Sequence, residues 1–202
     1  NSEILFNLKN RIKPFELEHE VDYPGSPKSI DSTGGNTIRR LLLAYDRGKS
    51  FKSWSMNKSV ASVLQGLFQS KYLKLVQSHH NCIMTKQPEY SSETHWHKDI
   101  RYWNFNNDYL INTWLPMGNE TIENGCLQVI RGSHKMGRVE HQKTGEQTGA
   151  DLSRVEAALA RMELVYCELE PGDAIFFHGN LLHRSDQNTS DNPRWSLICC
   201  YN

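Results

Sequence analysis

The sequence lacks any long hydrophobic run, because its longest uninterrupted apolar stretches, such as LLLAY, are far too short to span a bilayer. It also lacks net charge: 23 Lys and Arg residues balance 23 Asp and Glu residues in a chain of 202 residues, and the pI is about 7.3. No basic stripe interleaved with aromatic residues is present. These absences argue against a membrane or nucleic acid as partner.

The cysteines of the sequence do not form a recognisable metal or redox motif. The five cysteines are odd in number and lack the C-x-x-C spacing of common metal and redox motifs. Four of them lie inside apolar, strand-like runs, where a reduced cysteine behaves as a small hydrophobic residue. We therefore expect free thiols and a cytoplasmic protein.

No internal repeat or low-complexity segment divides the chain, and its length suits one domain with a sizeable core. We expect a single domain over residues 1–202. The chain begins at Asn1 rather than Met and stops after SLICCYN, so we also expect trimmed termini. The sequence does not indicate an oligomeric state.

Short strand candidates separated by turn residues dominate the chain. We expect strands over 37–45, 72–77, 81–86, 96–103, 109–116, 126–131, 164–170, 173–178 and 194–201. A 3.6-residue apolar period predicts two helices, over 57–70 and 151–163. The first would be capped by Asn57 and have its apolar face at Val60, Val63, Leu64, Leu67 and Phe68. The second would have its apolar face at Leu152, Val155, Leu159 and Met162. This pattern predicts a mainly β protein with flanking helices, of the double-sheet jelly-roll type.

Two segments, 18–36 and 134–151, are rich in Gly and polar residues and are predicted to be loops. Long loops of this kind often cover the mouth of a binding site, so we interpret both as candidate lids.

The stretch ETHWHKDIRYW places His95, His97 and Asp99 at alternate positions, which share one face of an extended strand. Two histidines and a carboxylate on one face are the set with which non-haem Fe(II) oxygenases hold iron and keep positions open. If His97-x-Asp99 supplies two ligands, the third must come from a distant segment. The stretch FFHGNLLHRSDQ offers His178 and His183.

Arg194 follows soon after and begins the apolar run RWSLICCY. An unpaired charge in such a strand is costly, whereas an Arg beside an iron site is well suited to a bidentate grip on a carboxylate. A co-substrate with a distal carboxylate, such as 2-oxoglutarate, would need this anchor.

Three segments in order resemble the phytanoyl-CoA dioxygenase family: HWHKD, ENGCLQVIRGSHK and EPGDAIFFHGNLLHRSDQNTSDNPRWSLICCYN. The resemblance covers the chain from about Tyr72 to the C-terminus. It implies a double-stranded β-helix, which is a cupin-like variant of the jelly roll. It also implies Fe(II), 2-oxoglutarate and O2 as cofactor and co-substrates.

Carried over position by position, the resemblance implies that iron is held by His97, Asp99 and His183. It implies that Arg194 binds the distal carboxylate of 2-oxoglutarate, with a hydroxyl contributed by Ser185 of the H-x-S motif. Trp114 falls, with a one-residue gap, where the family places a Trp near the co-substrate. The strand NCIMTK would form another wall of that pocket.

The activity implied by the resemblance is a dioxygenase reaction. It would hydroxylate an unactivated C–H bond of a small molecule and decarboxylate 2-oxoglutarate to succinate and CO2. Related halogenases replace the carboxylate ligand by a small residue, so Asp99 favours hydroxylation over halogenation. Desaturation and epimerisation by the same cofactors are alternatives. The sequence shows no positive cluster that would demand coenzyme A phosphates, so a small metabolite is as plausible a substrate as an acyl thioester.

Three other interpretations of the same residues fit the sequence less well. His95-x-His97 could open a cupin metal site, but Asp99 comes too early for the carboxylate of that motif. A non-catalytic jelly-roll binding protein would not need the three ligands and Arg194 together. A zinc hydrolase using the same ligands would leave Arg194 and Ser185 without a role.

The remaining polar and aromatic candidates have weaker patterns. Arg101, Tyr102 and Trp103 of RYWNF are candidate substrate-channel residues, or else ordinary core and surface residues of a sheet. His134 is expected to stabilise a turn. Of the adjacent residues His79 and His80, at most one can face inward, and no partner can be named for either.

Overall fold

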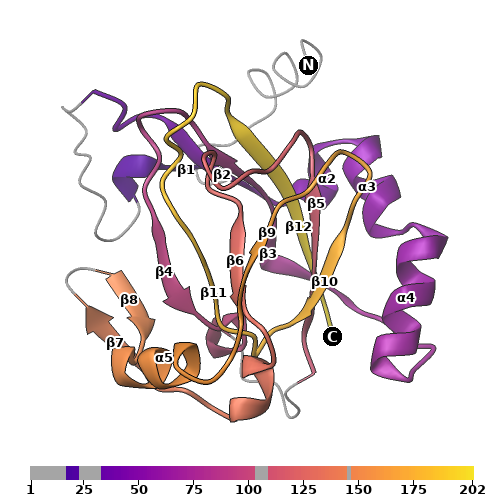
Figure 1. The fold of residues 1–202 in the computed structure, drawn as a ribbon. Coiled ribbons are helices and arrows are strands. Elements are labelled where there is room, and N and C mark those ends of the chain that lie inside the picture. Colours follow the sequence, from indigo (N-terminus) through magenta and orange to yellow (C-terminus); the bar gives the residue numbers. More distant parts are fainter. Residues whose placement is uncertain (1–16, 23–32, 103–108, 145–146) are drawn as a thin grey trace.

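The structure is a computed structural model that describes residues 17–22, 33–102, 109–144 and 147–202. Two antiparallel sheets form its body (Figure 1). The six-stranded sheet contains, in spatial order, β1 (Leu17–His19), β2 (Ile38–Leu42), β3 (Leu75–Lys86), β12 (Arg194–Tyr201), β5 (Ile111–Pro116) and β10 (Ile175–His178). The four-stranded sheet contains β4 (Thr94–His97), β11 (His183–Ser185), β6 (Leu127–Ile130) and β9 (Leu164–Cys167). Most neighbouring strands are far apart in the sequence, which confirms the expected jelly roll.

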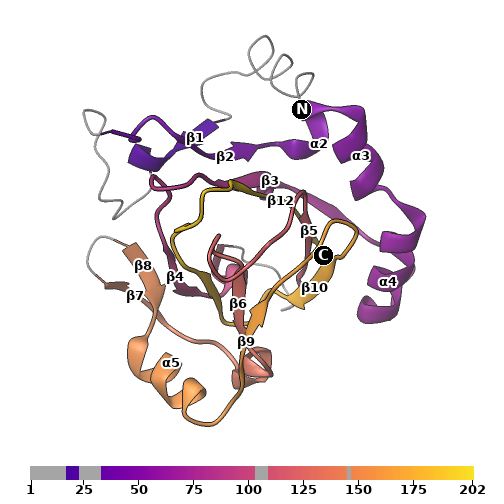
Figure 2. The same ribbon diagram turned by 45° about the horizontal axis from the view of Figure 1, so that its top comes forward.

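The inner faces of the two sheets enclose an apolar core, and Figure 2 shows the sheets curving around it. Side chains of both sheets contribute to this core, among them Cys82, Trp114, Leu127, Val129, Phe177 and Ile198. Strand β12 is buried on both faces: Ile198 faces this core, whereas Leu197 and Cys199 face outward onto the helices. Burial on both faces explains why the strand is a continuous apolar run in the sequence.

Three helices cover the outer face of the six-stranded sheet (Figure 1): α2 (Ala44–Arg47), α3 (Lys49–Ser55) and α4 (Lys58–Phe68). The side chain of Asn57 caps α4 as predicted, accepting hydrogen bonds from the backbone N–H groups of Ser59 and Val60. The packed face of α4 is narrower than expected. Val60 and Leu64 are buried against the sheet, but Val63 and Leu67 are exposed.

A smaller cluster packs on the outer face of the four-stranded sheet. It contains α5 (Leu152–Leu159) and the hairpin of β7 (His141–Thr144) and β8 (Gln147–Ala150), whose residues 145–146 lie outside the description. The apolar face predicted for α5 was partly wrong. Val155 and Ala158 are buried against Trp96 and its neighbours, whereas Leu152 and Leu159 remain exposed.

Several predicted boundaries were wrong. The strands expected at 72–77 and 81–86 are one strand, β3, because an irregular pairing with β12 lets the chain continue. Residues 37–45 divide into β2 and the start of α2. The strand expected at 96–103 ends at His97, and Asp99–Tyr102 form a 3₁₀ turn. The elements α3, β1, β7, β8 and β11 were not predicted, because short or polar segments carry weak periodicity.

Neither predicted lid is wholly a loop. Segment 18–36 contains the end of β1 and a 3₁₀ turn, and its residues 23–32 lie outside the description. Segment 134–151 contains the hairpin of β7 and β8, which packs near β4. Within the described ranges, no helix is long and apolar enough to cross a membrane.

Candidate metal centre

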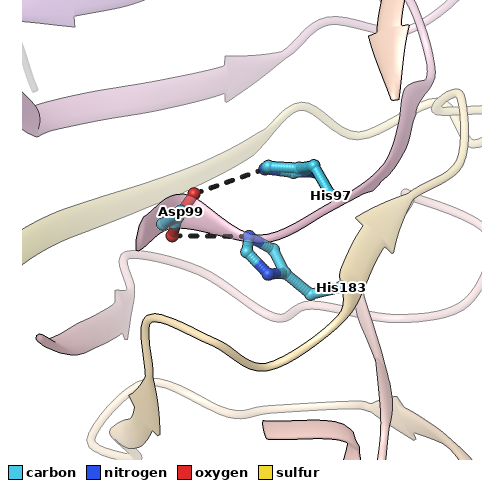
Figure 3. A group of neighbouring side chains, drawn as sticks. All are labelled: His97, Asp99 and His183. Carbon is cyan, nitrogen blue, oxygen red and sulfur yellow. Dashed lines mark ion pairs between the residues drawn. The ribbon is translucent and has the colours of Figure 1, made fainter. Parts of the chain in front are cut away.

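The structure brings together the side chains of the three predicted ligands, His97, Asp99 and His183 (Figure 3). His97 ends β4 and His183 begins β11, and the two residues are partners in the antiparallel pairing of these strands. The 3₁₀ turn after β4 brings Asp99 back toward both rings, so a turn rather than strand alternation places this carboxylate. One nitrogen or oxygen atom of each residue lies within 4.8 Å of the others.

The main chain sets the tautomer of both histidines. Nδ1 of His97 lies 2.8 Å from the carbonyl oxygen of His95, and Nδ1 of His183 lies 3.0 Å from that of Leu181. A carbonyl oxygen can only accept, so each Nδ1 carries the hydrogen and each Nε2 keeps a free lone pair. These Nε2 atoms point at Asp99, 3.4 Å from Oδ1 for His97 and 3.5 Å from Oδ2 for His183.

Charge at this centre also suits a cation. Burial, together with the nearby His97, lowers the pKa of His183 to about 4, so this ring is neutral at neutral pH. Burial alone would raise the pKa of Asp99, but the neighbouring His80, which also hydrogen-bonds to it, outweighs burial and holds that pKa well below its usual range. The site therefore presents an ionised carboxylate between imidazole lone pairs, which is the donor set of a two-histidine, one-carboxylate metal centre.

The three residues lie on the wall of a cavity between the sheets. Apolar side chains of the inner core, including Leu127, Phe177 and Ile198, form one part of its lining. Ser185 and Trp114, both predicted near the co-substrate, also line it. Cys82 and Met84 contribute from β3, so the predicted NCIMTK wall is present.

Four arginines also border the cavity, namely Arg39, Arg40, Arg101 and Arg184. These residues come from three segments that only folding brings together, so the sequence does not show them as a cluster. Two of them are paired with Glu18, whose carboxylate oxygens lie 3.1 Å from Arg39 and 2.5 Å from Arg40. Arg184 lies 3.4 Å from Asp186.

Arg194 is buried beside this cavity, with 1% of its surface exposed. Its Nη1 donates to the carbonyl oxygen of Gly125, while Nε and Nη2 have no hydrogen-bond partner among the described residues. The guanidinium lies 5.2 Å from the ring centre of Trp114, which does line the cavity. A buried cation with two unused donors is a place where a carboxylate would be stabilised.

Gly125 explains part of the NGC motif. Its φ of +78° is a conformation that favours glycine, and an added Cβ would lie 2.5 Å from the carbonyl oxygen of Asp186. Only glycine therefore allows this loop to approach closely enough for its own carbonyl to accept from Arg194.

Glu120, which the sequence analysis missed, holds Trp114. The indole Nε1 of Trp114 donates to both carboxylate oxygens of Glu120, at 2.9 and 3.0 Å, and the hydroxyl of Ser196 donates to one of them at 2.5 Å. Glu120 is 1% exposed. Because the indole N–H is used in this way, Trp114 can meet a ligand only through its ring. The sequence shows Glu120 only as a carboxylate a few residues after the strand expected at 109–116.

The remaining candidates fall away from the centre. His95 borders the cavity, but its Nε2 lies 3.1 Å from Glu93 and it is outside the group of three. His178 ends β10 and accepts a hydrogen bond from the backbone of Asn180. His134 lies against the ring of His178, and the nearby turn is instead tied by Ser133. Arg101 and Tyr102 border the cavity as one interpretation expected, and Trp103 lies outside the described residues.

All five cysteines are free thiols, as predicted. Burial raises the pKa of Cys82 to about 12, and the other four are raised in the same direction for the same reason. These thiols are therefore structural rather than reactive.

Fold and site together define a double-stranded β-helix protein with a two-histidine, one-carboxylate cluster in the wall of its cavity. Residues 26–196 match the family described as "Phytanoyl-CoA dioxygenase (PhyH)". The chain belongs to this family.

Curated relatives agree with this placement. The chain is 27% identical over 195 residues to a phytanoyl-CoA dioxygenase domain-containing protein 1 homolog of Caenorhabditis briggsae, covering 93% of the chain and 66% of the relative. It is 29% identical to phytanoyl-CoA dioxygenase 1 of Oryza sativa subsp. japonica, covering 97% of the chain and 67% of the relative. For the human peroxisomal phytanoyl-CoA dioxygenase the identity is 29%, over 61% of the chain and 38% of the relative. The chain thus spans about two thirds or less of these proteins.

Solved structures share the fold. EctD from S. alaskensis, crystallised with 2-oxoglutarate and 5-hydroxyectoine, superposes with a TM-score of 0.77 at 20% identity, covering 99% of this chain and 65% of that one. The epimerase SnoN from nogalamycin biosynthesis, in complex with Fe3+, α-ketoglutarate and nogalamycin RO, superposes with a TM-score of 0.74 at 19% identity, covering 99% and 71%.

Proposed function

We propose that this protein is an Fe(II)- and 2-oxoglutarate-dependent dioxygenase that hydroxylates an unactivated C–H bond of a small molecule. The observation that carries the proposal is the convergence of two imidazole lone pairs on an ionised, buried Asp99. Membership of the phytanoyl-CoA dioxygenase family supports it.

His97, Asp99 and His183 would hold the iron. Their donor atoms are mutually close enough for one cation to reach all three. The set has one negative charge and two neutral nitrogens, which suits a divalent metal and leaves positions open for other ligands. Iron bound there would supply O2 activation and the oxidation of 2-oxoglutarate to succinate and CO2.

Arg194 would bind the distal carboxylate of 2-oxoglutarate. Its unused Nε and Nη2 groups form one edge of the guanidinium, which matches a carboxylate in a bidentate pair. Ser185 follows His183 on β11 and lines the cavity, where its hydroxyl could donate to the same anion. Trp114 would keep the guanidinium in place through the face of its ring.

The inner core would exclude water from the reacting centre. Leu127, Phe177 and Ile198 form an apolar wall next to the ligand set. Exclusion of water strengthens the electrostatic contacts of the site and prevents wasteful side reactions. The chain's contribution would therefore be to place the co-substrate, the metal and the C–H bond together beside an apolar wall.

The first test is an anaerobic titration of the protein with Fe(II) and 2-oxoglutarate. The wild type should develop the visible charge-transfer band of an iron–2-oxoglutarate chelate, and Asp99→Ala should lose it. Asp46→Ala, which removes an exposed carboxylate of α2, is the matched control and should keep the band. Iron bound without any band would count against the proposal.

A second measurement separates an enzyme from a jelly-roll protein that only binds ligands. In air, an enzyme should convert 2-oxoglutarate slowly to succinate even without its substrate, whereas a binding protein should not. Succinate formation that is absent in the wild type despite the chelate band would favour the binding protein. Product analysis with a true substrate would then distinguish hydroxylation from desaturation or epimerisation.

A further inference from the structure

We propose that His80 and Asn112 are positioning residues that clamp the carboxylate of Asp99 in its metal-binding orientation. This inference rests on the proposed metal site. Each residue contacts a different oxygen of Asp99: Nε2 of His80 lies 3.0 Å from Oδ1, and Nδ2 of Asn112 donates to Oδ2 at 2.7 Å. Neither belongs to the group of three potential ligands.

His80 reaches the site through an irregularity in β3. Cys199 of β12 pairs with Asn81, but the next residue, Cys200, pairs with Val76, so the register passes over residues 77–80. Irregularities of this kind re-aim side chains and are common next to active sites. Here the irregular segment places the buried ring of His80 on the cavity wall, in contact with Asp99 and with its ring centre 5.3 Å from that of Tyr102.

The contact partner gives His80 a role different from that of the two ligand histidines. A carboxylate that binds a metal can only accept, so Nε2 of His80 carries the hydrogen and donates it to Oδ1 of Asp99. That nitrogen therefore has no lone pair for a metal. In His97 the main chain holds Nδ1–H instead and leaves Nε2 free. Histidine thus serves as a hydrogen-bond donor at position 80 and as a metal ligand at position 97, and the hydrogen-bond partner of each ring determines its role.

A hydrogen bond from Cys200 orients the amide of Asn112 toward Asp99. It lies on β5, fully buried, and its Oδ1 accepts a hydrogen bond from the thiol of Cys200. Because the thiol is the donor, the amide nitrogen must face the other way, toward Asp99. Two strands therefore contact the carboxylate, β3 through His80 and β5 through Asn112, and β12 supports Asn112 through Cys200.

The clamp matters because a carboxylate rotates easily about its last torsion, whose energy profile is broad. With one protein donor on each oxygen, rotation of the Asp99 carboxylate would break two hydrogen bonds in a buried site. Both oxygens keep their remaining lone pairs for the side that faces His97 and His183. The carboxylate is thus oriented before any metal arrives, and removal of such partners typically weakens metal binding about 10- to 100-fold.

The experiment measures metal affinity directly, by anaerobic titration with Co(II) alone and its visible d–d absorption. His80→Leu and Asn112→Leu should each weaken Co(II) binding by about 10- to 100-fold. His80→Gln should retain most of the affinity, because a glutamine amide can donate from near the position of Nε2. His80→Asn, equally polar but too short to reach Asp99, should behave like His80→Leu.

Two controls separate positioning from general damage. His134→Leu removes a half-buried histidine that does not border the cavity and should leave the affinity unchanged. The thermal midpoint of each metal-free variant reports on folding, and the comparison of His80→Gln with His80→Asn remains available if a leucine variant does not fold.

Each outcome bears on the inference. Weak binding by His80→Asn with near-normal binding by His80→Gln supports the clamp. Equal wild-type affinity in all four His80 and Asn112 variants would overturn it and leave the proposed function standing. A wild type that fails to bind Co(II) would overturn the proposed metal site and the clamp together.

Discussion

Replacement of Arg194 by methionine should separate ligand binding from stability. The guanidinium is buried and uses one of its three nitrogen atoms in a hydrogen bond to Gly125, while Nε and Nη2 have no hydrogen-bond partner in the described part of the chain. A purely structural arginine would have its donors satisfied by protein. The two unused donors of Arg194 are therefore available to a ligand.

The expected loss of 2-oxoglutarate affinity follows from the two unused donors. Hydrogen bonds to charged groups contribute about 1.5–3 kcal/mol each, so two of them amount to about 3–6 kcal/mol. That energy corresponds to a roughly 10²- to 10⁴-fold weaker dissociation constant in Arg194→Met. Arg194→Lys keeps the charge but not the planar fork, so its loss should be smaller.

The expected change in stability without 2-oxoglutarate is small. Methionine removes the hydrogen bond to Gly125 and the cation near the buried Glu120, both of which stabilise the fold. It also removes two buried unsatisfied donors, which cost about 1–3 kcal/mol each. These terms oppose one another, and buried charges are often replaced by apolar residues without loss, so the free energy of unfolding should change by no more than about 1.5 kcal/mol.

The assay combines a titration of 2-oxoglutarate into the iron-loaded protein, kept anaerobic, with urea unfolding of the metal-free protein. Arg131→Met is the matched control, because Arg131 is an exposed arginine paired with Glu163 on the surface. Unchanged 2-oxoglutarate affinity in Arg194→Met, together with a loss of several kcal/mol in stability, would refute the reasoning and make Arg194 a structural residue.

Three further predictions follow from individual contacts. Glu120→Gln should still accept a hydrogen bond from Trp114 but removes the buried negative charge, so the KM for 2-oxoglutarate should change more than kcat. Equal changes in KM and kcat would contradict a role of Glu120 in co-substrate binding. Gly125→Ala should lower the free energy of unfolding by about 1–3 kcal/mol because of its positive φ and the clash that a Cβ would make, whereas Gly118→Ala, with open space around it, should be nearly neutral in the same unfolding assay. Burial lowers the pKa of His141 to about 4 in the folded protein, so on acidification this histidine is protonated in the unfolded chain before it is protonated in the folded one. The free energy of unfolding should therefore fall as the pH drops from about 6.5 toward 4. The thermal midpoint of His141→Gln should fall less steeply than that of the wild type over this pH range.

The sequence was sufficient to predict the features that depend on residues close together in the chain. Asn57 caps a helix through bonds to the next turn, and the PGD turn reverses the chain between β9 and β10. The H-x-D motif, the second histidine and the strand arginine stand in a characteristic order, so His97, Asp99, His183 and Arg194 could be named from the sequence. The structure brings the first three together and buries the fourth beside the cavity.

Other features escaped the sequence because their partners are distant along the chain. His80 acquires its role from an irregular strand pairing, and Glu120 from a contact with the Trp114 indole. The cluster of arginines around the cavity arises only when β2, β11 and the turn after β4 meet. Strand alternation also gave the wrong local geometry for Asp99, because the chain leaves the sheet before this residue.

The sequence by itself determined the fold class and the candidate ligand set, because hydrophobic periodicity and the order of the family's motifs can both be recognised along the chain. Tertiary structure alone decided which polar groups surround that chemistry. The carboxylate of Asp99, for example, accepts hydrogen bonds from donors on two separate strands, and such long-range contacts leave no periodic trace in the sequence.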